Sequence, residues 1–171
     1  GNHTLSGKSL VFSGSDTSLY VYGGTWDLGG SALYHGGSYY DANARREKFL
    51  LDGTALRNIN YCYLDGACDG QLWLTNGASV SVLNQIEVGV NEGNFADISS
   101  GSVINQGNQQ TKIACGAGKG GNVVQFRNAS IIRMPGTYAH TYFCGGSPSN
   151  RVVFTDGASA YTPYADFFKG E

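Results

Sequence analysis

One phrase recurs along the chain every 24–28 residues, and it restricts what the chain can fold into. LWLTNGASV at 72–80 returns almost unchanged as VVFTDGASA at 152–160. Looser copies are KFLLDGTAL at 48–56, ADISSGSVI at 96–104 and VVQFRNASI at 123–131, the last with one residue fewer after its Asn. A period of this length is the signature of a repeat architecture, in which each copy builds one structural unit.

Within each copy, constant and variable positions alternate with the period of two that is typical of a β-strand. Columns that are always apolar are expected to face a core, and columns that vary from aromatic to charged are expected to face water. The first apolar column is Leu50, Leu74, Ile98, Phe126 and Phe154. The second is Leu56, Val80, Ile104, Ile131 and Ala160. The variable column is Phe49, Trp73, Asp97, Gln125 and Val153.

The small polar residue of each copy, usually followed by Gly, indicates a turn, because Asn and Asp tolerate left-handed backbone and Gly adopts it without steric cost. No stretch sustains a helical period, and the 26 glycines interrupt any candidate helix. A sandwich of antiparallel hairpins does not need equivalent residues at a fixed interval, whereas stacked coils do. The sequence therefore predicts an all-β fold, a right-handed parallel β-helix (β-solenoid) with coils of about 24–28 residues.

The pattern is regular over residues 48–171 and blurred over 1–47, where we expect irregular coils with a loop inserted near 39–49. The chain starts and stops in the middle of the pattern, so we expect one continuous domain cut from a longer array. An isolated solenoid would need caps over the unpaired strands of its first and last coils.

Composition excludes several functional classes. Disorder is excluded because 41% of the residues are hydrophobic, and a net charge of −2 leaves no basic patch for nucleic acid. No apolar run approaches the roughly 20 residues of a membrane-spanning helix, so we expect no membrane insertion by this segment. GAGKGGN at 116–122 lacks the ending of a phosphate-binding loop. We therefore expect no cofactor.

The four cysteines, Cys62, Cys68, Cys115 and Cys144, include no CxxC pair, and the histidines are scattered, so no metal site is expected. Cys115 and Cys144 are predicted to share one buried repeat position with Val88. A ladder of free thiols and a disulfide between neighbouring coils both remain open.

The repeat, a short strand, a Gly turn, GN, a second strand, then [ST][ND]GAS and a third strand, resembles those of bacterial surface and secreted β-helix proteins. The nearest resemblance, over about 48–171, is to autotransporter-type passenger regions. It implies an extracellular or cell-surface module, held at the outer membrane through segments not present here. It implies an adhesin, stalk or matrix role and brings no catalytic residue.

Three functional hypotheses follow. The first is a non-catalytic stalk or adhesin whose partners are a carbohydrate or host surface and the rest of its own longer chain. Its candidate ligand-binding residues are aromatic: Trp73, Phe49, Tyr39 and Tyr40. The second is a carbohydrate-active enzyme, a polysaccharide lyase or glycoside hydrolase, which needs paired carboxylates at a set separation, or a base beside a cation or Ca²⁺. Its candidates are Asp65, Asp69 and Glu87, with Asp41 and Arg45 or Arg46 beside them. The third, a phage fibre segment, needs an apolar outward column.

Overall fold

The computed structural model describes residues 1–4, 9–35, 43–64, 68–115, 120–133, 140–145, 149–162 and 164–167. At 132, 133, 166 and 167 it describes the backbone alone. Every pair of strands within this part of the chain is parallel, and the strands form one six-stranded and one twelve-stranded sheet. The predicted all-β parallel solenoid is thus confirmed.

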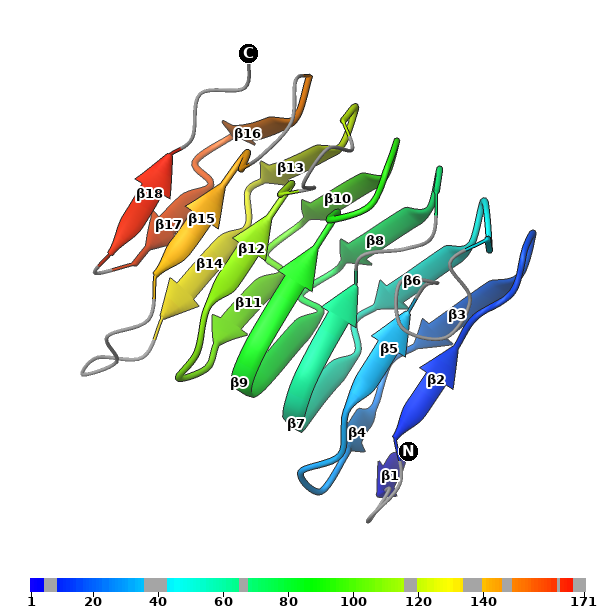
Figure 1. The fold of residues 1–171 in the computed structure, drawn as a ribbon. Coiled ribbons are helices and arrows are strands. Elements are labelled where there is room, and N and C mark those ends of the chain that lie inside the picture. Colours follow the sequence, from blue (N-terminus) through cyan, green and yellow to red (C-terminus); the bar gives the residue numbers. More distant parts are fainter. Residues whose placement is uncertain are drawn as a thin grey trace.

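The coils have three walls, and the strands of each wall lie side by side (Figure 1). Wall 1 is the six-stranded sheet: β3 (Ser18–Tyr22), β6 (Lys48–Asp52), β8 (Gln71–Thr75), β10 (Phe95–Ser99), β13 (Val123–Arg127) and β16 (Arg151–Thr155).

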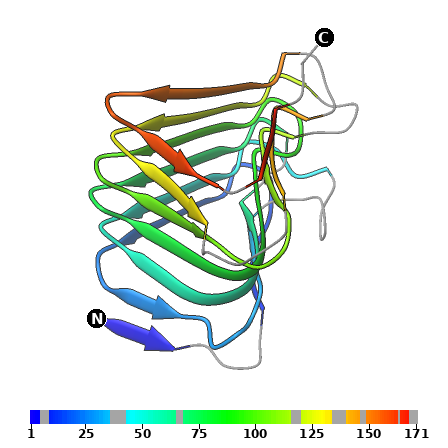
Figure 2. The ribbon, with the colours of Figure 1, turned by 90° about the vertical axis from the view of Figure 1, so that its left-hand side faces the viewer.

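The twelve-stranded sheet bends into walls 2 and 3, because β7 (Ala55–Leu64) and β9 (Ser79–Val88) each run through both. Wall 2 otherwise holds β1 (Asn2–Thr4), β4 (Thr25–Asp27), β11 (Val103–Gln106), β14 (Ser130–Arg133) and β17 (Ser159–Tyr161). Wall 3 otherwise holds β2 (Leu10–Phe12), β5 (Leu33–His35), β12 (Thr111–Ile113), β15 (Thr141–Phe143) and β18 (Ala165–Phe167). Figure 2 shows the coils stacked one on another.

Residue pairing in wall 1 fixes the coil lengths. Successive partners are 30, 23, 24, 28 and 28 residues apart, beginning with the pair Ser18 and Lys48. Leu74 pairs with Ile98 in parallel on the next coil, as the repeat predicts. The second apolar column is also paired as predicted, since its members are successive partners on wall 2: Leu56, Val80, Ile104, Ile131 and Ala160. The first four are buried, whereas Ala160 in β17 is exposed.

The first column needs one correction. Leu51, fully buried, aligns with Leu74, whereas Leu50 aligns with Trp73 and lies on the outer face. The prediction of an outward Phe49 is wrong for the same reason, because Phe49 is 2% exposed. The continuous inner column is Val21, Leu51, Leu74, Ile98, Phe126 and Phe154.

The error arises at the corner between walls 1 and 2, which has two lengths. The longer form uses two left-handed residues, as in Asn76–Gly77 with φ of 53° and 72°. The shorter form uses one, such as Gly53 with φ 57° or Asn128 with φ 47°. KFLLDGTAL therefore lacks a corner residue just as VVQFRNASI does, and aligning it without a gap shifts its strand by one position.

The cysteine position is also corrected. Val88 pairs with Ile113, and Ile113 pairs with Phe143, so neither thiol occupies that buried position. Cys144 follows Phe143 directly with φ 58°, whereas Cys115 lies two residues beyond Ile113. Cys62 belongs to a third column, where it pairs with Leu33 and Ile86.

Candidate functional site

The two predicted carboxylates that the structure describes each lie beside a cation. Asp69 lies on the corner between walls 3 and 1, with its carboxylate 3.6 Å from Arg45, and both side chains are more than half exposed. Glu87 lies on wall 3, where its Oε1 accepts hydrogen bonds from Gln85 Nε2 at 2.5 Å and Lys112 Nζ at 2.8 Å. No contact among the described residues joins Asp69 to Glu87. Asp65 and Asp41 lie outside the described residues.

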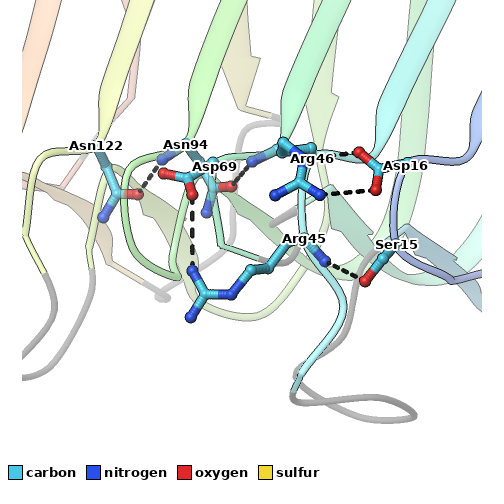
Figure 3. A network of polar contacts seen from close by, with 8 residues as sticks. Ser15, Asp16, Arg45, Arg46, Asp69, Asn94 and Asn122 are labelled. Carbon is cyan, nitrogen blue, oxygen red and sulfur yellow. Dashed lines mark hydrogen bonds and ion pairs between the residues drawn. The ribbon is translucent and has the colours of Figure 1, made fainter.

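Figure 3 shows the corner that carries Asp69. Arg46 donates two hydrogen bonds to the carboxylate of Asp16, at 2.6 and 2.7 Å, and the Arg45 amide donates to Ser15 Oγ at 3.1 Å. The hydrogen bond from Arg46 lowers the pKa of Asp16, and the same bond raises the pKa of Arg46. These ions are solvated, so the network holds neighbouring coils in register at the surface and contributes little stability.

Glu47, one residue beyond these arginines, is fully buried and accepts a hydrogen bond from the Gly14 amide at 2.6 Å. The charged run that begins at Arg45 is therefore only partly solvated. Lys48 and Phe49 already belong to β6, so the predicted loop near 39–49 overlaps a strand at its end.

Buried asparagines continue this corner through the later coils. The Oδ1 of Asn94 accepts from the Gly70 amide at 2.8 Å, and the Oδ1 of Asn122 accepts from the Asn94 amide at 3.0 Å. Asn150 in turn accepts from the Asn122 amide at 3.1 Å. The sequence signal is the GN or SN that directly precedes β10, β13 and β16, and its role is internal, because all three side chains are buried.

The exposed aromatic side chains of wall 1 form the surface best suited to a ligand. Tyr20 pairs with Leu50 and Leu50 with Trp73, so the three stand in one outward column across adjacent strands. Tyr22, two residues beyond Tyr20 in β3, faces the same side. Tyr20 is 48% exposed and Tyr22 68%, while Leu50 and Trp73 are partly exposed. We call Tyr20, Tyr22, Leu50 and Trp73 the aromatic platform.

The spacing of the platform follows from the sheet. Strands in a sheet lie about 4.8 Å apart, so Tyr20 and Trp73, two strands apart, are separated by about 10 Å along the solenoid axis. At the next strand the column changes character, because Asp97 forms a two-point ion pair with Arg127. This pair raises the pKa of Arg127, mainly through the hydrogen bond to Asp97. The apolar surface therefore ends after three strands.

Of the predicted ligand-binding aromatics that the structure describes, Trp73 lies on this surface and Phe49 does not. Phe49 is on the inner face and cannot contact a surface ligand, and Tyr39 and Tyr40 lie outside the described residues. Sequence reasoning missed Tyr20 and Tyr22, although the alternation in SLYVYGG places both on one face of a strand.

Two open hollows lie along the bend between walls 2 and 3, each with a volume of about 380 Å³. One is lined by residues that include Ser31, Tyr34 and Tyr61. The other is lined by residues that include Ser81 and Asn105, whose Nδ2 donates to Ser81 Oγ at 3.0 Å. Among the described residues, neither lining includes Asp, Glu, His, Lys or Arg, so these hollows offer mainly hydroxyl and amide groups.

Comparison of the chain with protein-family models, with curated proteins and with solved structures found no match. The described residues contain no group of three or more His, Cys, Asp or Glu that could hold a metal ion. They also contain no helix long and apolar enough to cross a membrane. What the geometry defines is a class, a parallel β-solenoid, whose wall 1 carries an aromatic outer surface.

Proposed function

We propose that this chain is a non-catalytic module of a bacterial surface protein, a stalk or adhesin outside the cell that binds an extended carbohydrate. The stalk role is supported by continuous in-register pairing across the coils, which makes the solenoid a stiff rod rather than a flexible linker. The resemblance of the repeat to autotransporter-type passenger regions supports the location.

The observation that carries the binding role is the aromatic platform. Aromatic rings bury large areas, and the CH face of a pyranose ring packs against them without requiring any charge. Tyr20 and Trp73 stand about 10 Å apart along the axis, two strand spacings. An extended β-linked disaccharide unit has a similar length, so a glycan chain lying along the axis places alternate sugars over these two rings.

The test is a binding measurement with uncharged β-linked glycans, using insoluble cellulose and chitin in sedimentation assays and their soluble oligosaccharides in calorimetry. Trp73→Ala and Tyr20→Ala are expected to weaken binding about tenfold, because each removes a ring from the proposed sugar contact and a loss of about 1.4 kcal/mol is a tenfold change. Tyr161→Ala is the matched control, because Tyr161 is 61% exposed but lies on wall 2.

Binding that is lost equally in all three variants, or no binding by the native chain, would refute the platform. Incubating the same glycans with the protein and assaying new reducing ends, or unsaturated ends for a lyase, separates a binding module from the carbohydrate-active alternative. Cleavage that persists in Asp69→Asn and Glu87→Gln would leave the sequence-predicted carboxylates without a role.

A further inference from the structure

Two cysteines lie on adjacent coils at the corner that leads from wall 3 to wall 1. Ile113 and Phe143 are paired partners at the ends of β12 and β15. Cys144 is the first residue beyond its strand and Cys115 the second beyond its own, so the two are offset by one position. Both thiols are free in this structure.

The sulfur of Cys115 points across to the coil that carries Cys144. Its Sγ lies 3.2 Å from the carbonyl oxygen of Tyr142, and it accepts a hydrogen bond from the Gly145 amide at 3.1 Å. These two partners bracket Cys144 in the sequence. A weaker local contact joins the same sulfur to the carbonyl of Ile113 at 3.3 Å.

The backbone separation suits a disulfide. Ala114 and Cys144 follow the paired strand ends at equivalent positions, both with left-handed φ, of 53° and 58°. Cys144 therefore neighbours Ala114 across one coil spacing of about 4.8 Å, and Cys115 is the next residue along the chain. Disulfides span Cα separations of about 4.4–6.8 Å, which is the scale of one coil spacing with an offset of one residue.

We propose that Cys115 and Cys144 form a disulfide that joins adjacent coils when the protein meets an oxidising compartment. The oxidant is a small disulfide such as oxidised glutathione. The thiolate of Cys144, the more exposed cysteine, attacks it and releases one small thiol. Cys115 then displaces the second small thiol from the mixed disulfide. Two protein thiols lose two protons and two electrons, and the small disulfide is reduced to two thiols.

Burial is the main cause that raises the pKa of both thiols, so the thiolates that react are scarce at neutral pH. The Gly145 amide opposes this shift at Cys115. Oxidation should accordingly speed up as the pH rises from 7 to 9.

The other two cysteines lie elsewhere in the solenoid. Cys62 is buried in the column of Leu33 and Ile86, and the backbone of Cys68 forms an isolated parallel β-bridge with that of Arg45.

The test is to incubate the purified chain with oxidised glutathione at pH 8, block remaining thiols and digest with trypsin. The expected product joins peptide 113–119, which carries Cys115, to peptide 134–151, which carries Cys144. Cys62 and Cys68 share one tryptic peptide, 58–112, so the assignment is unambiguous. The number of free thiols should fall from the four of this structure by half. The melting temperature should rise by roughly 5–10 °C and return on reduction.

Cys144→Ala should abolish the cross-link, and Cys68→Ala, the matched control, should leave it intact. If Cys144→Ala does not fold, Cys115→Ser provides the same test. A thiol count that stays unchanged in the native chain, or a cross-link that joins other peptides, overturns the proposal. These readouts involve no glycan, so the result is independent of the proposed function.

Discussion

His35 should make this protein sensitive to acid through one buried imidazole. Its ring is almost wholly enclosed on wall 3, 5.4 Å from the ring of Phe12 and 5.1 Å from that of Phe49. Neither ring nitrogen has a hydrogen-bond partner among the described residues. Burial lowers the pKa of His35 from 6.5 to about 3, because a protonated ring there would lose its hydration without compensation.

The sign and size of the effect follow from this shift. Below pH 6.5 the unfolded chain binds a proton that the folded chain excludes, so the free energy of unfolding falls as the pH falls. The fall continues to about pH 3, where the folded state also takes up the proton. One pKa unit corresponds to about 1.4 kcal/mol, so His35 alone should remove about 3 kcal/mol between pH 7 and pH 4.

The perturbation is His35→Phe, which keeps an aromatic ring against Phe12 and Phe49 but cannot titrate. Urea unfolding at pH 7 and pH 4 gives the free energy of unfolding for each protein. Carboxylates titrate in both proteins, so their contribution cancels in the difference. The variant should lose about 3 kcal/mol less than the native chain on acidification. His35→Leu provides the same test if the larger Phe ring fits poorly.

Phe143→Leu, which changes a buried ring on the same wall but no titratable group, is the control and should keep the native pH dependence. If His35→Phe and the native chain lose the same free energy between pH 7 and pH 4, within about 0.5 kcal/mol, the imidazole is not held neutral and the reasoning fails.

Three further predictions test the core, a corner and a close approach, each by urea unfolding or thermal melting. Leu74→Asp should destabilise the protein severely, because it buries a charge in the inner column, whereas Trp73→Ser on the outer face should change stability little. Similar losses of unfolding free energy in the two variants would contradict the register. Asn122→Ala should lower the free energy of unfolding by about 1–3 kcal/mol, since the Asn94 amide loses its buried acceptor; an unchanged midpoint would argue against the asparagine row. Gly107→Ala should lower the free energy of unfolding much more than Gly101→Ala, because a Cβ at 107 would lie 2.3 Å from the backbone carbonyl carbon of Leu83. A Cβ at 101 meets nothing, so that substitution costs only the strain of its left-handed φ, about 1 kcal/mol.

The sequence predicted the parallel stacking because identical constraints recur at every coil. A residue such as Ile104 touches its counterparts Val80 and Ile131 directly, so chemical similarity at a fixed interval records physical contact. The predicted register was wrong for the copy at 48–56, where the corner is one residue shorter than in the copy at 72–80. The corner at Gly53 turns with a single left-handed residue, and nothing in KFLLDGTAL distinguishes that turn from the two-residue form.

The surface was harder to predict than the core. Asp69 and Arg45 were grouped correctly, because both occupy corner positions on neighbouring coils, but Glu87 lies on a wall and pairs with Lys112. Tyr20 and Tyr22 were missed because their coil is 30 residues long and falls outside the period of the later copies. Which outward residues share a surface depends on the length of the intervening coil, and that length is set by the third wall and its loops.

Stacking in register also limits how far any binding surface can extend. Each outward column changes residue at every strand, about 4.8 Å along the axis, and is under no pressure to stay the same. On wall 1 the column runs Tyr20, Leu50 and Trp73, then reaches Asp97 with its ion pair to Arg127. A ligand that packs on apolar rings therefore meets at most three strands before it must desolvate an ion pair. The coils continue beyond this surface, but the sugar contact proposed for the aromatic platform would be confined to the coils that carry β3, β6 and β8.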